Sequence, residues 1–257
     1  MESKFSQKQL DAARKKIIFA LDVDDLKKAK NIINDLGPHV GGIKIGLETQ
    51  TVFGGPIMLD LTEKQDVDTF YDGKFNDIPA TIIGATKPLA KRGVGMFNIH
   101  ATSGNEAIKA AVKACESAGC IVLVVTVLTS ISPEECMEIF GDTPENKVLQ
   151  FARKAKANGA HGVVCSAKEL PVLMADEETH SLIKVTPGIQ PEWMQKNDQQ
   201  RVMTPYEAIK AGADYLVIGR AISQPPKDHE YIQGDSLKAI ELITEEIAKA
   251  LSEMNIE

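Results

Sequence analysis

Eight short apolar runs, separated by longer amphipathic stretches, are the feature that most constrains the fold of this chain. The runs lie at 17–21, 42–45, 67–71, 94–99, 121–127, 162–165, 182–185 and 215–219. The stretches between them have helical spacing, and several end in glycine, which commonly follows the last turn of a helix. Eight repeats of strand and helix over 257 residues predict an α/β protein of the (β/α)8 TIM barrel type, although doubly wound sheets share this alternation.

The length and composition fit one barrel domain over residues 1–257 or two smaller domains. With 43% hydrophobic and 25% charged residues, the chain can bury a full core. It contains no internal repeat, low-complexity segment or obvious linker. We therefore expect a single domain, with the segments 1–14 and 245–257 forming peripheral helices.

Charge and cysteine content narrow the class of protein. A net charge of −7 argues against a broad surface for nucleic acid but permits a local phosphate site. The chain has four cysteines without a C-x-x-C pair, so we expect reduced thiols. No stretch approaches the roughly 20 apolar residues of a membrane span, and the polar N-terminus is unlike a signal peptide. These features predict a soluble cytoplasmic protein with no membrane partner.

The most informative motif is DGKFNDIPA at 72–80. Asp72 and Lys74 are two residues apart, so in a strand they project from the same face. Asp77 follows just before Ile78-Pro79, where a helix is expected to begin. If the three charged side chains converge on one cavity, the two carboxylates keep the lysine charged. The alternative for an isolated motif of this spacing is a surface ion pair with a helix-capping aspartate.

Polar residues occur at the carboxyl ends of several predicted strands, where barrel enzymes build their active sites. They are Asp22, Lys44, Asp72, Lys74, His100, Thr126, Thr129, Gly219 and Arg220. One charge after a strand is usually only the first solvated loop residue, but a barrel would direct all of these side chains to one rim. We therefore predict a shared active site, and we interpret His100 as a structural residue.

The residues after the last predicted strand indicate a phosphate site. Gly219 lets backbone N–H groups approach an anion, and Arg220 can bind it bidentately. Barrel enzymes commonly hold phosphate with the loops after strands seven and eight. The loop at 186–205 is long and rich in proline and polar residues, which is typical of either a mobile lid or an exposed excursion.

Taken together, these motifs resemble those of the orotidine 5′-phosphate decarboxylase family over nearly the whole chain. The family signature D-x-K-x-x-D-I-P-x-T stands at 72–81. Its other landmarks follow in order: FALD ending at Asp22, KIG starting at Lys44, VTVLTS including Thr129, VTPGI ending at Ile189, Asp198-Gln199, and IGR ending at Arg220. The resemblance implies decarboxylation of orotidine 5′-monophosphate to uridine 5′-monophosphate in pyrimidine synthesis, without a metal or organic cofactor.

The resemblance also implies roles for single residues. Asp22 and Lys44 would hold the ribose hydroxyls, and Thr129 would lie on the pyrimidine side. Asp77 and Thr81 would reach into the neighbouring site of a symmetric homodimer, so that each protomer would be incomplete alone. The phosphate would be bound by Gln199, Gly219 and Arg220.

One position departs from the family pattern. After TPGI the bacterial-type pattern has an arginine that helps to bind phosphate, whereas this chain has Gln190. An amide can still donate hydrogen bonds but contributes no charge. Arg220 would therefore carry more of the phosphate recognition here.

The residue types suit the implied chemistry. Loss of CO₂ leaves a carbanion-like transition state at C6, which a protein without a cofactor must stabilise electrostatically. We interpret Lys74 as the group that stabilises this charge and protonates C6, while Asp72 and Asp77 orient the lysine and keep it protonated.

Two alternatives stay open. A related barrel enzyme that acts on a sugar phosphate, such as a 3-keto-gulonate 6-phosphate decarboxylase or a hexulose-phosphate synthase, can share the Asp-Lys-Asp motif but would use a divalent metal. A non-catalytic nucleotide-binding module would keep the phosphate site and lose the chemistry. The intact set of Asp72, Lys74 and Asp77 argues against such a module.

Overall fold

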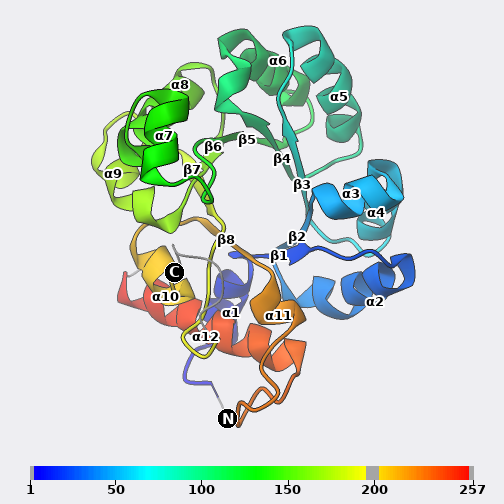
Figure 1. Cartoon of the computed structure of the whole chain (residues 1–257). Coiled ribbons are helices and arrows are strands. Elements are labelled where there is room, and N and C mark those ends of the chain that lie inside the picture. Colours follow the sequence, from blue (N-terminus) through cyan, green and yellow to red (C-terminus); the bar gives the residue numbers. More distant parts are fainter. Residues whose placement is uncertain (1–2, 195–202, 255–257) are drawn as a thin grey trace.

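The fold is a closed parallel β-barrel surrounded by helices (Figure 1). The computed structural model describes residues 3–194 and 203–254. Within these ranges each strand pairs in parallel with the next, and β1 pairs with β8 to close the ring. The predicted (β/α)8 barrel is therefore confirmed, and the doubly wound sheet is excluded.

The strands follow the predicted apolar runs closely. They are β1 (Ile17–Leu21), β2 (Gly42–Ile45), β3 (Thr69–Phe75), β4 (Met96–His100), β5 (Ile121–Val125), β6 (Gly162–Val164), β7 (Ile183–Thr186) and β8 (Tyr215–Ile218). The apolar run of the third strand ends at residue 71, and the observed β3 continues to Phe75, so that Asp72 and Lys74 lie on the strand as expected. Residues 72–75 of the motif thus belong to the strand, residues 76–78 connect it to α5, and α5 begins at Pro79.

Helices cover the outside of the barrel. They are α1 (Gln7–Arg14), α2 (Leu26–Leu36), α3 (Leu47–Phe53), α4 (Gly55–Glu63), α5 (Pro79–Lys91), α6 (Asn105–Cys115), α7 (Pro133–Phe140), α8 (Pro144–Ala157), α9 (Leu170–Ala175), α10 (Pro205–Lys210), α11 (Arg220–Ser223) and α12 (Ser236–Glu253). Short 3₁₀ helices lie at Gly37–His39, Ala101–Ser103 and Ala167–Glu169. The terminal helices α1 and α12 pack against each other, and α12 begins well before the expected residue 245.

The core has two layers, because successive side chains of a strand point to opposite faces. In β1, Ile17, Phe19 and Leu21 pack outward in the cluster between strands and helices, whereas Ile18 and Ala20 belong to the interior cluster of the barrel. The same alternation in the other strands determines which side chains face the barrel axis. It therefore decides which residues reach the rim of the barrel at the carboxyl ends of the strands.

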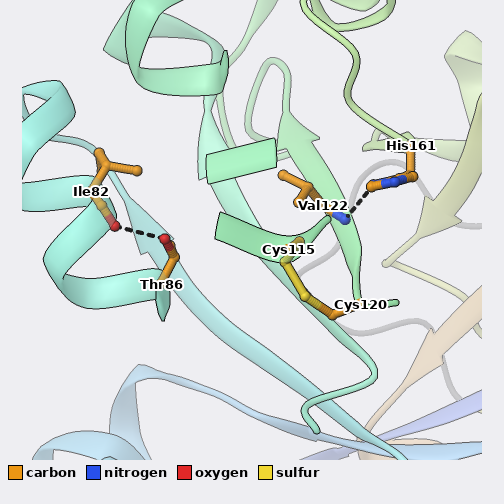
Figure 2. The surroundings of a disulfide bond; sticks show 6 residues. All are labelled: Ile82, Thr86, Cys115, Cys120, Val122 and His161. Carbon is orange, nitrogen blue, oxygen red and sulfur yellow. Dashed lines mark hydrogen bonds between the residues drawn. A yellow bond between two sulfur atoms is a disulfide. The ribbon is translucent and has the colours of Figure 1, made fainter. Parts of the chain in front are cut away.

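The expectation of reduced thiols is wrong for two of the four cysteines. Cys115, the last residue of α6, forms a disulfide with Cys120, the residue before β5 (Figure 2). The turn at 116–119 brings the two side chains together, a spacing that a search for C-x-x-C overlooks. Cys136 and Cys165 are buried thiols, as expected. The cysteines therefore do not support the inference of a reducing compartment.

The disulfide lies at the amino-terminal end of β5 and thus at the end of the barrel opposite to the rim. Beside it, the backbone N–H of Val122 donates a hydrogen bond to His161 Nδ1 over 3.0 Å (Figure 2). Among the described residues, no helix has the length and apolar character needed to cross a membrane.

Candidate active site

Polar side chains replace the apolar interior of the barrel near the carboxyl ends of β2, β3 and β4. Lys44 lies between Ile43 and Ile45, which pack outward, so its own side chain faces the barrel axis. Asp72 follows the interior residue Phe70 by two positions and shares its face. The strand period thus brings residues from separate parts of the sequence to one rim.

Four of these side chains form a row of alternating charge, which we call the charged row: Asp22, Lys44, Asp72 and Lys74. Lys44 Nζ lies 3.6 Å from Asp22 Oδ1 and 3.3 Å from Asp72 Oδ2. Lys74 Nζ donates a hydrogen bond to Asp72 Oδ1 over 2.7 Å. The structure therefore brings together four of the residues that the sequence placed in one site.

Asp72 is the centre of the charged row, and only 6% of it is exposed. Burial by itself raises the pKa of this carboxyl group. The positive charges of Lys44 and Lys74, together with hydrogen bonds from Lys74 and Asn98, outweigh burial and hold the pKa of Asp72 below its usual value. Asp72 is therefore ionised at neutral pH and attracts both lysine side chains.

A glycine makes room for the charged row. A Cβ atom at Gly46, the glycine of the KIG motif, would lie 2.7 Å from Lys44 Nζ and 2.9 Å from Asp22 Oδ1. Any larger residue would displace this ion pair. The glycine of the motif thus has a steric role beside the charged groups.

Asn98, in the middle of β4, was missed by the sequence interpretation. Its Nδ2 donates to Asp72 Oδ1 over 2.6 Å, and its Oδ1 accepts from the backbone N–H of Lys74 over 2.7 Å. A signal was present, because Asn98 is a polar residue at an interior position of the apolar run VGMFNI. A buried amide in such a run needs partners, and those partners are the charged groups of the neighbouring strand.

His100 lies at the end of β4 beside the charged row and is partly buried. Burial lowers its pKa, the positive charge of Lys74 lowers it further, and Asp72 opposes this shift. The imidazole is therefore neutral at pH 7.

Asp77 and Thr81 are not brought to the charged row within one chain. Asp77 Oδ1 accepts the backbone N–H of Ile78 over 2.7 Å at the start of α5. The whole segment 76–81 is exposed. Across the described ranges, the ion pairs of Lys74 do not include Asp77, so in the single chain Asp77 has the local role of a residue at a helix start.

The residues expected to bind phosphate and pyrimidine lie after β5, β7 and β8. Thr129 and Arg220 are exposed, and Gly219 immediately precedes Arg220, the first residue of α11. The backbone N–H of Gln190 donates to the carbonyl of Met203 over 3.0 Å, which joins the two ends of the loop after β7. Gln199 lies outside the described residues, as does the central part of the loop interpreted as a lid. Thr126 is buried, and its Oγ1 donates to the carbonyl of Val164 over 2.9 Å, which makes it structural.

In the described part of the chain, no group of three or more His, Cys, Asp and Glu side chains is gathered closely enough to hold a metal ion. In the charged row itself, the ammonium group of Lys44 stands between the carboxylates of Asp22 and Asp72, and Lys74 pairs with Asp72 alone. What the row offers a ligand is fixed positive and negative charge and hydrogen-bond donors.

Known proteins resemble this chain over most of its length. The sequence model of the Orotidine 5'-phosphate decarboxylase / HUMPS family matches residues 15–233, from just before β1 to the segment before α12. The chain belongs to this family. The match spans all eight strands and all four members of the charged row.

Individual members of the orotidine 5′-phosphate decarboxylase family are similar over most of the chain. The protein named orotidine 5'-phosphate decarboxylase from Shewanella sediminis is 44% identical over 215 residues, which cover 82% of this chain and 91% of that protein. The protein of the same name from Heliobacterium modesticaldum is 37% identical over 250 residues, covering 93% and 98%. The crystal structure of orotidine 5'-phosphate decarboxylase from Lactobacillus acidophilus superposes with a TM-score of 0.73 at 31% identity and covers 90% and 98%.

Proposed function

We propose that this protein is an orotidine 5′-phosphate decarboxylase, a carboxy-lyase that converts orotidine 5′-monophosphate to uridine 5′-monophosphate and CO₂ in pyrimidine synthesis. The observation that carries the proposal is the charged row at the barrel rim, in a chain whose similar relatives bear this name. The row supplies fixed electrostatic stabilisation, which is what a decarboxylation without an electron-accepting cofactor needs.

Lys74 is the group that acts on the reacting carbon in this proposal. When the bond between C6 and the carboxylate breaks, CO₂ leaves and the electron pair stays on C6. The ammonium of Lys74 stabilises this charge and donates a proton to C6, and the neutral amine then regains a proton from water. Asp72, 2.7 Å from Lys74 Nζ, holds the ammonium in its direction before the reaction.

The remaining residues would bind parts of the substrate that do not react. Asp22 and Lys44 are assigned to the ribose hydroxyls and Thr129 to the pyrimidine side, while the phosphate is assigned to Gln190, Gln199, Gly219 and Arg220. Support for this assignment comes from Arg220, which is exposed at the rim and has no ion pair within residues 3–194 and 203–254. Binding energy from the phosphate and ribose can be used to organise the site around C6.

We also propose a homodimer in which Asp77 and Thr81 enter the site of the neighbouring protomer. The two side chains are exposed and unused by the charged row of their own chain. Beside them, Ile78 is 65% exposed and Ile83 is 44% exposed, and an apolar surface of this kind is stabilised when a partner covers it. A second copy would then add a carboxylate to the Asp72–Lys74 pair.

Mixing two inactive variants tests this arrangement. Lys74→Ala and Asp77→Ala should each be inactive as homodimers. After the subunits exchange, half of the dimers are mixed, and each mixed dimer has one site with both native groups. About one quarter of the wild-type activity should therefore return. If the mixture stays inactive although exchange is demonstrated by mass, Asp77 does not complete the neighbouring site.

The activity itself is tested by following the ultraviolet absorbance of orotidine 5′-monophosphate with purified protein in the presence of a chelator. We expect rapid loss of the substrate absorbance with wild type and none with Lys74→Ala. Activity that the chelator abolishes would favour the metal-dependent sugar-phosphate enzyme. No activity from a folded dimer would favour a binding module.

A cytoplasmic location is part of the proposal. The phosphate group of the substrate is charged and does not cross a membrane unaided, so the enzyme must share the compartment in which the nucleotide is made. Fractionation of cells with an antibody to this protein tests the location.

A further inference from the structure

The pairing of β3 with β4 is irregular at the charged motif. Phe70 and Tyr71 pair with Met96 and Phe97, but the next paired residues are Phe75 and Ile99. Three residues of β3 (72–74) thus lie opposite the single residue Asn98 of β4. Such a bulge leaves backbone groups without their regular ladder partners and redirects side chains.

The bulge places Lys74 in an unfavourable backbone conformation. Lys74 has a φ of +45°, in the left-handed region that residues other than glycine rarely adopt. Such a conformation persists only when the surrounding structure enforces it, and it is common at functional sites. Something beyond the strand ladder must therefore hold Lys74 in place.

Asn98 supplies that restraint with both ends of its amide. Its Oδ1 accepts the backbone N–H of Lys74 over 2.7 Å, and its Nδ2 donates to Asp72 Oδ1 over 2.6 Å. The side chain is only 1% exposed, so water does not compete for these bonds. Asparagine is suited to the position because one short planar group provides an acceptor and a donor together.

The same bonds fix the orientation of Asp72. Its Oδ1 accepts from both Asn98 Nδ2 and Lys74 Nζ, and its Oδ2 faces Lys44. The carboxylate is therefore held from three strands at once. Rotation of the Asp72 carboxylate would break its hydrogen bond to the buried amide of Asn98. The position of Asp72 Oδ1, and with it the direction of the hydrogen bond from Lys74 Nζ, is therefore fixed.

We propose that Asn98 is a positioning residue for decarboxylation: its amide locks the backbone of Lys74 and the carboxylate of Asp72 so that the ammonium is directed at the reacting carbon. The inference rests on the proposed function, because it assigns a task to Asn98 in that reaction. Asn98 acts through Lys74 and Asp72 and donates no proton itself.

Two substitutions separate the parts of this role. Asn98→Leu preserves the approximate volume and removes both hydrogen bonds. Asn98→Asp keeps the acceptor for the Lys74 N–H but replaces the donor to Asp72 by a second carboxyl group. Since displacement of a catalytic group by about 1 Å can cost on the order of 100-fold in rate, we expect Asn98→Leu to lower kcat by about 100-fold and to change KM by less than about threefold.

The pH dependence of Asn98→Asp is the sharpest readout. The new carboxyl group would lie against Asp72, and two carboxylates so close favour a shared proton at low pH. The other groups around Asp72 are Lys44 from β2, Lys74 on β3 and His100 from β4, while Asp22 faces Lys44. These groups are also present in wild type, so their titration cancels in the ratio of variant to wild-type kcat. The ratio of variant to wild-type kcat should therefore rise from pH 8 to pH 5.5 for Asn98→Asp and stay constant for Asn98→Leu.

Leu173→Ala is the control for loss of stability, because Leu173 is a fully buried residue of α9 outside the rim. At a comparable loss of melting temperature it should keep wild-type kcat. The proposal is overturned if both Asn98 variants keep kcat within about threefold of wild type, or if the Asn98→Asp ratio does not depend on pH. If Asn98→Leu does not fold, the pH profile of Asn98→Asp by itself tests the proposal. Wild-type protein that fails to decarboxylate the substrate would instead refute the proposed function.

Discussion

Strands β1–β4 and strands β5–β8 end at the same rim but carry unlike side chains there. At the rim of β1–β4 the charged row, contributed by β1, β2 and β3, is paired within the chain, with distances from 2.7 to 3.6 Å between successive charged groups. After β5 and β8, Thr129 and Arg220 are exposed, and Arg220 has no ion pair in the part of the chain that the structure describes. The half of the rim formed by β1–β4 is internally paired, whereas the half formed by β5–β8 presents Thr129 and Arg220 to solvent.

The difference corresponds to the roles of the two halves in the proposed reaction. A group that stabilises a transition state is most effective when it needs no rearrangement during the reaction, and charged groups that hold one another in place meet this condition. A group that binds phosphate can pair with the ligand instead, and an exposed arginine avoids the cost of a buried unpaired charge. The predictions below test this division.

Removal of Lys74 should have the largest effect. Because Lys74 supplies both the proton and the positive charge in the proposed mechanism, Lys74→Ala should lower kcat by about 10⁴-fold or more, while KM changes much less. Stopped-flow or long-time absorbance assays measure the two constants. Lys91→Ala, at an exposed lysine at the end of α5, is the matched control and should behave as wild type. A kcat for Lys74→Ala above about one hundredth of wild type would show that the charge lies elsewhere.

Removal of Arg220 tests the half of the rim formed by β5–β8. Loss of hydrogen bonds to a charged group costs about 1.5–3 kcal/mol, so Arg220→Ala should lower kcat/KM for the nucleotide by about 10- to 150-fold. With orotidine, which lacks the phosphate, the variant and wild type should be equal. Arg153→Ala removes a surface arginine paired with Asp176 and should change neither substrate's rate. An equal loss with both substrates would mean that Arg220 does not act through the phosphate.

The charged row should also make the free energy of unfolding depend on pH in the acidic range. Because the pKa of Asp72 is lowered in the folded protein, its ionised form stabilises the fold above about pH 4, its value in an unfolded chain, and this contribution is lost as the pH falls through the folded-state pKa. Asp72→Asn should lower the free energy of unfolding by about 3 kcal/mol at pH 7, and the difference from wild type should shrink below pH 4. Thermal unfolding between pH 2.5 and 7 measures this. Asp35→Asn, on the exposed face of α2, should show no such trend.

The smallest effect is expected at the end of the barrel opposite to the rim. The Cys115–Cys120 disulfide closes a short loop, so Cys120→Ser should lower the free energy of unfolding by about 2 kcal/mol. Activity should stay within about twofold of wild type, because neither half of the rim contacts this turn. A thiol reductant should lower the melting temperature of wild type to about that of Cys120→Ser. It should leave the melting temperature of Cys120→Ser unchanged. A loss of activity in Cys120→Ser would link this end of the barrel to the site.

Much of the candidate site could be predicted from local patterns. Asp22, Lys44 and Asp72 follow or lie within apolar runs at positions whose direction the strand period determines, so their meeting at one rim followed from the barrel. Asn98 was missed because its importance depends on a bulge in the neighbouring strand. The resemblance implied that Asp77 reaches the site of a neighbouring protomer, which stays a prediction; in one chain Asp77 lies at the exposed start of α5.

The sequence by itself determined the eight strands, the barrel and the family, because apolar periodicity and short motifs are local properties of the chain. Only the tertiary structure decided the register of β3 against β4, the left-handed conformation of Lys74 and the closure of the Cys115–Cys120 disulfide. These features depend on which backbone and side-chain groups meet across strands and turns. Such meetings are set by packing of the whole barrel, where buried polar groups must find partners that no local pattern specifies.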